Sequence, residues 1–186
     1  MPRSDTYTAF MMDYVAGNHP DSFELAAELH VSLSRQGADI SDIWSMIGGV
    51  LLEDPTLVKA RPAPRTRLPK QPGKPRISAS EILMRTERTL RWRRGLSGVH
   101  YAPASVPGTK FMKLEAGKSA PMHGHHGLEA TVVLSGRFSD GYGTYSRGDL
   151  VLGEPGMRHK PAAVGEVPCV CFVAHRPNRF WNRIMT

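Results

Sequence analysis

One stretch decides the fold of this chain: PMHGHHGLEATVVLSG, at residues 121–136. Its His123, His125 and Glu129 all carry odd numbers, so on an extended strand their side chains face the same side. Neighbouring same-face residues lie roughly 6.5–7 Å apart at Cα, so two imidazoles can share one ion. A further histidine, His159, follows a Pro-Gly turn. Three histidines and one carboxylate suit a divalent transition metal, so these four residues are the predicted metal ligands.

The ligand set leaves the identity of the metal open. We expect one ion per chain, with zinc as the first choice and iron, manganese or nickel as alternatives. His126 has the opposite parity and is expected to be exposed or to lie behind the ligands. It becomes a ligand only if the strand carries a bulge. The alternative interpretation is a surface cluster of histidines that arose by chance.

The sequence around this stretch has the pattern of short strands. Residues 108–114, 131–138 and, more loosely, 142–152 alternate apolar and polar side chains. Residues 169–174, CVCFVA, have the pattern of a buried strand that closes the unit. Glycine-containing turns recur between these segments, which predicts a β-sandwich or a β-barrel.

The two cysteines, Cys169 and Cys171, share one face of the last predicted strand. We favour two reduced thiols in the core over a redox-reactive pair. Such sparse use of cysteine is typical of a cytoplasmic protein, and no apolar run is long enough to cross a membrane.

Residues 1–58 have the pattern of a small unit of three helices. Apolar residues recur at helical spacing over 7–15 and again over 21–33. Residues 36–38 (QGA) are expected to end the second helix, and Asp39 is expected to cap a third helix whose apolar stripe runs to Leu51. Such a bundle is marginal alone and is expected to complete its core on a partner.

A basic, proline-rich segment separates this helical unit from the β-rich unit. Residues 61–76 contain five prolines and six Lys or Arg, which predicts an extended linker over 59–78 and a second domain over 79–186. Nine acids and three bases give residues 1–59 a charge of −6, whereas the remaining 127 residues carry +13. Because the charge is divided in this way, the basic total does not indicate DNA binding, and none is expected.

The histidine stretch resembles the cupin family. Its first motif is matched at five anchor positions: Gly117, His123, His125, Glu129 and Gly136. The second motif is matched at Gly148, Gly156 and His159, with Glu154 where the motif has proline and Ala163 where it has asparagine. The resemblance implies an antiparallel jelly-roll barrel with the metal inside. The fold class is therefore α+β and multidomain, a three-helix unit followed by an all-β cupin.

A finer resemblance covers both units. The segments 136–161 and 13–37 are similar to the cupin and the helices of ChrR-type anti-sigma factors. The resemblance implies that the helices occlude an extracytoplasmic-function sigma factor and that the cupin controls its release under oxidative signals. Dimerisation through the cupin is left open.

The zinc motif of those helices is incomplete in this chain. The family pattern is His-x3-Cys-x2-Cys with an upstream histidine, and here these positions hold His30, Ser34, Gly37 and a residue near Asp5. Serine is a poor zinc ligand and glycine supplies none, so we expect no zinc in the helical unit. His30 is expected to be exposed or to cap a helix.

Two functions remain in competition. As an anti-sigma factor, the chain would bind its partner through apolar side chains of the helical stripes: Phe10, Tyr14, Trp44, Ile47 and Leu51. The alternative is a dioxygenase-like cupin metalloenzyme with an N-terminal helical dimerisation unit. No catalytic base is evident beside the metal ligands, and the acidic helical unit favours the regulator, so no catalytic residue is assigned.

Overall fold

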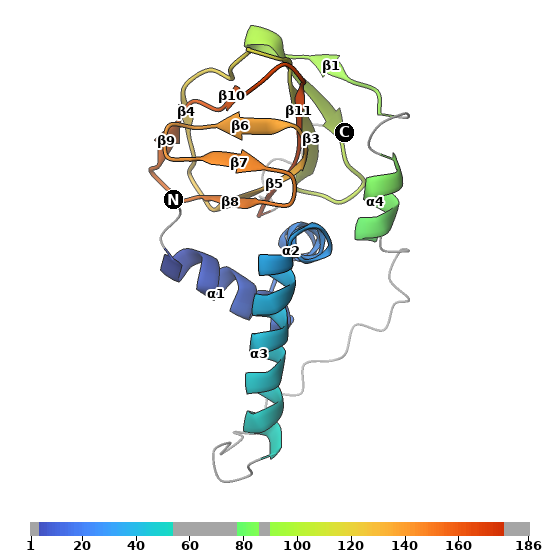
Figure 1. Cartoon of the computed structure of the whole chain (residues 1–186), viewed down its shortest axis with the longest axis vertical. Coiled ribbons are helices and arrows are strands. Elements are labelled where there is room, and N and C mark those ends of the chain that lie inside the picture. The colour runs from blue at the N-terminus through green and yellow to red at the C-terminus, as the bar shows by residue number, and fades with distance from the viewer. Residues whose placement is uncertain (1–3, 54–77, 86–89, 177–186) are drawn as a thin grey trace.

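A computed structural model describes residues 4–53, 78–85 and 90–176 of the 186-residue chain (Figure 1). The helices are α1 (Ser4–Val15), α2 (Asp21–Leu33), α3 (Arg35–Glu53) and α4 (Ala79–Arg85), with a short 3-10 turn at Leu96–Gly98. The strands are β1 (Arg93–Arg94), β2 (Val99–Pro103), β3 (Thr109–Leu114), β4 (His123–Gly124), β5 (Glu129–Ser135), β6 (Arg137–Ser139), β7 (Thr144–Ser146), β8 (Leu150–Gly153), β9 (Arg158–His159), β10 (Ala162–Ala163) and β11 (Cys169–His175). The predicted linker lies outside the described residues except for Ser78 and stays a prediction.

The β-rich unit is an antiparallel barrel built from one large and two small sheets. The large sheet has the strand order β1-β2-β3-β11-β5-β8. A three-stranded sheet, β10-β6-β7, and the β4–β9 pair complete the barrel (Figure 1). Phe138 of the small sheet packs with Val133 and Cys171 of the large one, so the two sheets share an interior.

Both faces of the large sheet are buried. Alternate residues of β5 show the pattern, because Val133 points into the barrel whereas Val132 and Leu134 join a second core on the opposite face. That second core contains side chains from the sheet and from α1, α2 and α4. Burial on two faces explains why β5 and β11 contain uninterrupted apolar runs rather than a strict alternation.

The helical unit packs on the outer face of the large sheet. Helix α2 lies against the barrel, α1 and α3 contact α2, and α3 points away from the barrel (Figure 1). The hydroxyl of Ser22 on α2 donates to the carbonyl of His175 at 2.9 Å. The hydroxyl of Thr6 on α1 donates to Glu154 at 2.6 Å. The helices and the barrel therefore share one core and are joined by side-chain hydrogen bonds from α1 and α2.

The predicted break between the second and third helices is wrong in its position and its length. Only Ser34 leaves the helical conformation, with φ −124° and ψ 127°. Its hydroxyl accepts the Gly37 amide at 3.3 Å, and its carbonyl accepts the Ala38 amide at 3.0 Å. Ser34 thus ends α2 and caps α3, so Asp39 lies inside the third helix rather than at its start.

The prediction for His30 is also wrong, because this side chain is buried and only 2% exposed. It lies four residues after Ala26 and seven after Phe23, on the face of α2 that enters the core. Its Nδ1 donates to the Gly148 carbonyl at 2.7 Å, and the Tyr7 hydroxyl donates to its Nε2 at 2.8 Å. Burial lowers the pKa of His30 against the opposing effect of the Gly148 hydrogen bond, so the ring is neutral near pH 7.

Gly37 allows this histidine to be buried. A Cβ at position 37 would lie 2.8 Å from the Cδ2 atom and 2.9 Å from the Nε2 atom of His30. The helix therefore carries glycine at this position despite its low helix propensity, because α3 crosses the His30 ring too closely for any side chain.

We expect Gly37→Ala to lower the free energy of unfolding by about 1–3 kcal/mol, because the clash outweighs the better helix propensity of alanine. Gly48→Ala on the same helix is the matched control. Nothing lies within 4 Å of a Cβ at position 48, so this change should add about 0.5–1 kcal/mol. Denaturant unfolding of both variants measures the difference, and equal effects would contradict the close packing at Gly37.

None of the helices in the described stretches combines the length and the apolarity that crossing a bilayer requires.

Candidate metal centre

The three predicted histidines come together at the mouth of the barrel. His123 on β4 pairs directly with His159 on β9, and His125 forms a bridge with Pro155 just beyond β4. The chain then bends at residues 126–127 before Glu129 begins β5. The predicted continuous strand is therefore interrupted, but the two histidines before the bend still face one centre.

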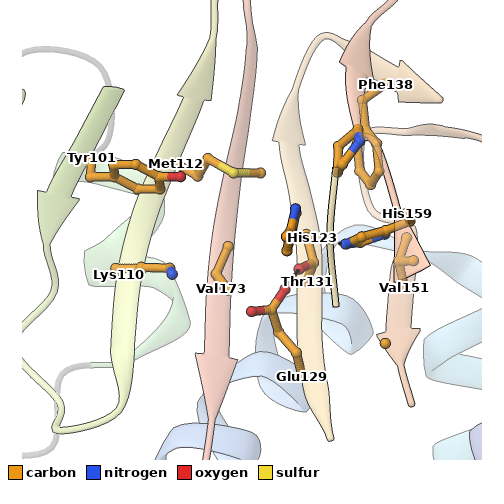
Figure 2. Close-up of a pocket in the computed structure, with 12 residues that line it drawn as sticks. Tyr101, Lys110, Met112, His123, Glu129, Thr131, Phe138, Val151, His159 and Val173 are labelled. Carbon is orange, nitrogen blue, oxygen red and sulfur yellow. Dashed lines mark hydrogen bonds between the residues drawn. The ribbon is translucent and has the colours of Figure 1, made fainter. Parts of the chain in front are cut away.

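The Nε2 atoms of the three imidazoles converge. Those of His125 and His159 are 2.9 Å apart, and those of His159 and His123 are 3.1 Å apart. All three ligand atoms lie within 4.8 Å of one another. Figure 2 shows His123 and His159 pointing toward the same space from different strands.

An oxygen atom faces the other nitrogen of each ring. The Nδ1 of His123 lies 2.9 Å from the Pro121 carbonyl. The Nδ1 of His125 lies 3.7 Å from Glu129 Oε2, and that of His159 lies 3.5 Å from Asp140 Oδ2. An oxygen that faces Nδ1 favours a proton on that nitrogen, and this tautomer leaves the Nε2 lone pair available to a metal.

Three lone pairs that point at one another repel unless a cation lies among them. Nitrogen ligands about 2.0–2.1 Å from a tetrahedral zinc ion lie roughly 3.3 Å apart, close to the separations seen here. Burial lowers the pKa values of His125 and His159, so both rings are neutral near pH 7 and can coordinate. The triad of His123, His125 and His159 can therefore hold a metal ion.

Asp140 supports the triad, and the local sequence around it, a glycine-containing turn, does not indicate this role. Its side chain is fully buried. Oδ1 accepts the amides of Tyr142 and Gly143 at 2.9 and 3.1 Å, which fixes the carboxylate in the turn. The other oxygen, Oδ2, faces His159. Burial, followed by the charge of Asp140, raises the pKa of Tyr145 to about 12.

Gly153 and Glu154 shape the loop beside His125. A Cβ at Gly153 would lie 2.9 Å from the Cδ2 atom of the His125 ring, so a side chain there would displace this imidazole. Glu154, at the position where the cupin motif has proline, accepts the Thr6 hydroxyl and precedes the residue that bridges to His125. Glu154, which departs from the motif, therefore links α1 to residues 153–155, the loop beside His125 that is called the metal loop below.

The fourth predicted ligand, Glu129, lies behind His125 rather than among the Nε2 atoms. Its carboxylate faces the Nδ1 of that ring and the barrel cavity. A carboxylate beside the Nδ1 atom of His125 orients that ring, which is the role of Glu129 in this conformation. His126 is exposed, in agreement with its parity.

The two cysteines lie deeper in the barrel, and both are free and buried. Their Sγ atoms are 3.7 Å apart. The hydrogen bond from Cys169, followed by burial, raises the pKa of the Cys171 thiol well above its usual value, so this sulfur is a protonated core group.

The predicted partner-binding residues divide into three groups. Phe10 is 3% exposed and packs on His19 and Phe23 within the core. Tyr14 and Trp44 are half-buried against the same core. Ile47 and Leu51 on α3 are exposed.

A barrel of this topology with an inward-facing histidine triad is a cupin, and residues 80–179 match the family described as the ChrR cupin-like domain. The anti-sigma-E factor ChrR of Cereibacter sphaeroides is 30% identical over 193 residues, covering 92% of this chain and 89% of that protein. The chain belongs to the ChrR family of anti-sigma factors.

A solved structure extends this similarity to the whole fold. The crystal structure of Rhodobacter sphaeroides SigE in complex with the anti-sigma ChrR contains a chain with a TM-score of 0.70 and 27% identity. The match covers 90% of this chain and 95% of that one. The predicted order, helices and then a cupin, is confirmed.

We expect Asp140→Asn to weaken metal binding by about 10- to 100-fold, because the amide no longer stabilises the Nδ1–H of His159. Asp149→Asn is the control, since Asp149 accepts hydrogen bonds from Ser146 in an exposed turn and faces none of the three triad histidines. Competition with a chromophoric chelator measures both affinities. An unchanged affinity in Asp140→Asn would contradict the supporting role.

Proposed function

We propose that this chain is an anti-sigma factor whose helical unit binds an extracytoplasmic-function sigma factor and whose cupin triggers release on an oxidative signal. Membership of the ChrR family supports this function, and the related ChrR chain was crystallised in complex with SigE. The observation in this chain that carries the proposal is an apolar face on α3 that nothing in the described structure covers.

The uncovered face consists of five large side chains on one side of α3. Met46 and Val50 are 72% and 63% exposed. The other three are Ile43, Ile47 and Leu51. They follow the i, i+3, i+4, i+7, i+8 spacing of an amphipathic helix, yet they point away from the barrel core. A contiguous apolar stripe of this kind is typical of a protein-binding surface.

Three of the predicted contact residues fit this surface. Ile47 and Leu51 belong to the α3 face, and Trp44 lies at its edge with its indole N–H buried and unpartnered in the described part of the chain. The part of the Trp44 ring that stays exposed could pack against a partner, which makes Trp44 a candidate anchor. Phe10 supports the helices from inside the core instead.

Charge complements the apolar stripe. Residues 1–59 carry −6, whereas surfaces that bind DNA phosphate are basic. The helical unit would therefore attract the DNA-binding surfaces of a sigma factor and compete with DNA for them. The apolar contact would supply most of the affinity, and the charges would speed association.

The proposed signal input is a single divalent metal, with zinc as the first choice and iron, manganese or nickel as alternatives. His123, His125 and His159 would bind it, with Glu129 turning from His125 to complete the shell. The converging Nε2 lone pairs support this assignment. When bound, the metal would supply a Lewis-acidic centre at the barrel mouth.

Helix α2 gives the signal a route to the partner surface. It contacts β5, β8 and β11 on one side and α3 on the other. Hydrogen bonds from Ser22 and His30 attach it to the end of β11 and to the turn before β8. A change in the barrel that moves these strands would be passed to α3 through packed side chains.

We expect Ile47→Asp and Leu51→Asp each to weaken binding of the full chain to the sigma factor of the same organism by at least about 30-fold, because each buries an unpaired charge. Ser45→Asp is the control, since Ser45 is exposed on the opposite side of α3. Biolayer interferometry and a transcription assay measure the loss. If the wild-type chain neither binds nor inhibits the sigma factor, the regulatory function fails and an oxygen-uptake assay tests the metalloenzyme alternative.

We expect the purified protein to contain about one equivalent of a divalent metal per chain. The double variant His123→Ala, His159→Ala should lose it, because two of three nitrogen ligands disappear. Glu129→Gln should weaken binding, and His126→Ala should leave it unchanged because that ring is exposed. Elemental analysis measures the metal content of each variant. Full metal occupancy in the double variant would refute the proposed site.

A further inference from the structure

Lys110 points into the barrel, where its charge has no evident function in metal binding. It lies on the inner face of β3, and the strand register places it in a row with Val173 of β11 and Thr131 of β5. All three side chains line one cavity together with His123 and His159 of the triad. Figure 2 shows the lysine entering this space from the side opposite His159.

The ammonium of Lys110 has no acidic partner in the described residues. No carboxylate among them lies within 4.0 Å of its Nζ atom. The ammonium instead lies over the face of the Tyr101 ring, 5.3 Å from the ring centre. A cation–π contact of this kind holds the lysine in place without neutralising it.

Lys113, on the other face of the same strand, shows the contrast. Its ammonium lies 2.8 Å from a carboxylate oxygen of Glu115 and 5.5 Å from the centre of the Trp92 ring. Lys113, on the outer face of β3, is therefore paired with a carboxylate, whereas Lys110, inside the barrel, is not.

The cavity is lined by both charged and apolar side chains. Lys110, Glu129 and two triad histidines, His123 and His159, form the polar and charged part of the lining. Met112, Phe138, Val151 and Val173 supply the apolar wall. With a divalent ion on neutral imidazoles, the charges are +2, +1 and −1, which leaves a net positive charge. A positive cavity that also offers an apolar wall favours a small amphipathic anion.

We propose that this cavity binds a short-chain carboxylate, with the carboxylate group between Lys110 and the triad and the hydrocarbon chain against Met112 and Phe138. Lys110 would donate a charge-assisted hydrogen bond to one oxygen, and the other would face the metal. The inference rests on the proposed metal centre and not on sigma-factor binding. It assigns Lys110 as the residue that selects an anionic ligand for the cupin.

The test uses the full-length, metal-loaded protein with 13C-methyl-labelled methionine, in buffer without chloride or other carboxylates. Metal content is measured first, and acetate, propionate and butyrate are then titrated. We expect a saturable shift of the Met112 methyl resonance. Lys110→Met should weaken binding by about 10- to 100-fold through loss of the charged hydrogen bond. Lys113→Met is the matched control and should bind as the wild type does.

A second measurement needs no variant. Propionamide has nearly the shape of propionate but no charge, so it should bind the wild type at least about tenfold more weakly. Lys110→Arg, which keeps the charge, should retain most of the affinity. Sub-stoichiometric metal would count against the metal centre itself. Three results at full metal occupancy would each overturn the carboxylate site. The first is the absence of a saturable shift, and the second is equal binding of propionate and propionamide. The third is equal affinity in the Lys110→Met and Lys113→Met variants.

Discussion

The burial of the large sheet on both faces is the constraint on which the rest of this structure depends. One face closes the barrel around the histidines, and the other receives α1 and α2. Each face stabilises the other, because removing the helices would expose Val132 and Phe172 to water, at a cost of roughly 25 cal/mol per Å² of apolar area.

The same constraint determines which helical surface is free. The apolar face of α2 is buried against the sheet and the neighbouring helices. The outer half of α3, in contrast, contacts nothing else in the described structure. Binding of a partner on α3 therefore does not require the helices to leave the barrel first. A signal would then act by changing the angle of α3 or the support beneath it, rather than by uncovering a hidden surface.

Hydrogen bonds and close packing surround the helical residue that stands at a zinc-ligand position of the family motif. His30 keeps the position of a zinc ligand in the family motif, but Tyr7 and the Gly148 carbonyl satisfy its two ring nitrogens. Gly37 lets α3 approach the ring. The contacts join α1, α2, α3 and the turn before β8, so one buried imidazole connects both units. A zinc ion would order the helices among themselves, whereas this arrangement also orders them on the barrel.

The sequence predicted the barrel and the histidine triad well, because strand parity and turn residues are local properties. It failed where tertiary packing decides. Asp140 could be read only as a turn residue, and its second oxygen becomes informative once His159 lies beside it. The prediction that His30 is exposed or caps a helix assumed that a histidine from an incomplete zinc motif has no other structural role. The prediction of a break at residues 36–38 assumed that glycine ends a helix. In both cases the deciding contact lies on another element, which no local pattern shows.

The hydrogen bond between Thr6 and Glu154 has a practical consequence for handling the protein. Glu154 precedes the residue that bridges to His125, so the beginning of α1 is a neighbour of the metal loop although the two lie 148 positions apart in sequence. An affinity tag or a fluorescent fusion placed directly before Ser4 would crowd this junction. Metal occupancy measured on such a fusion would report the tag as well as the barrel.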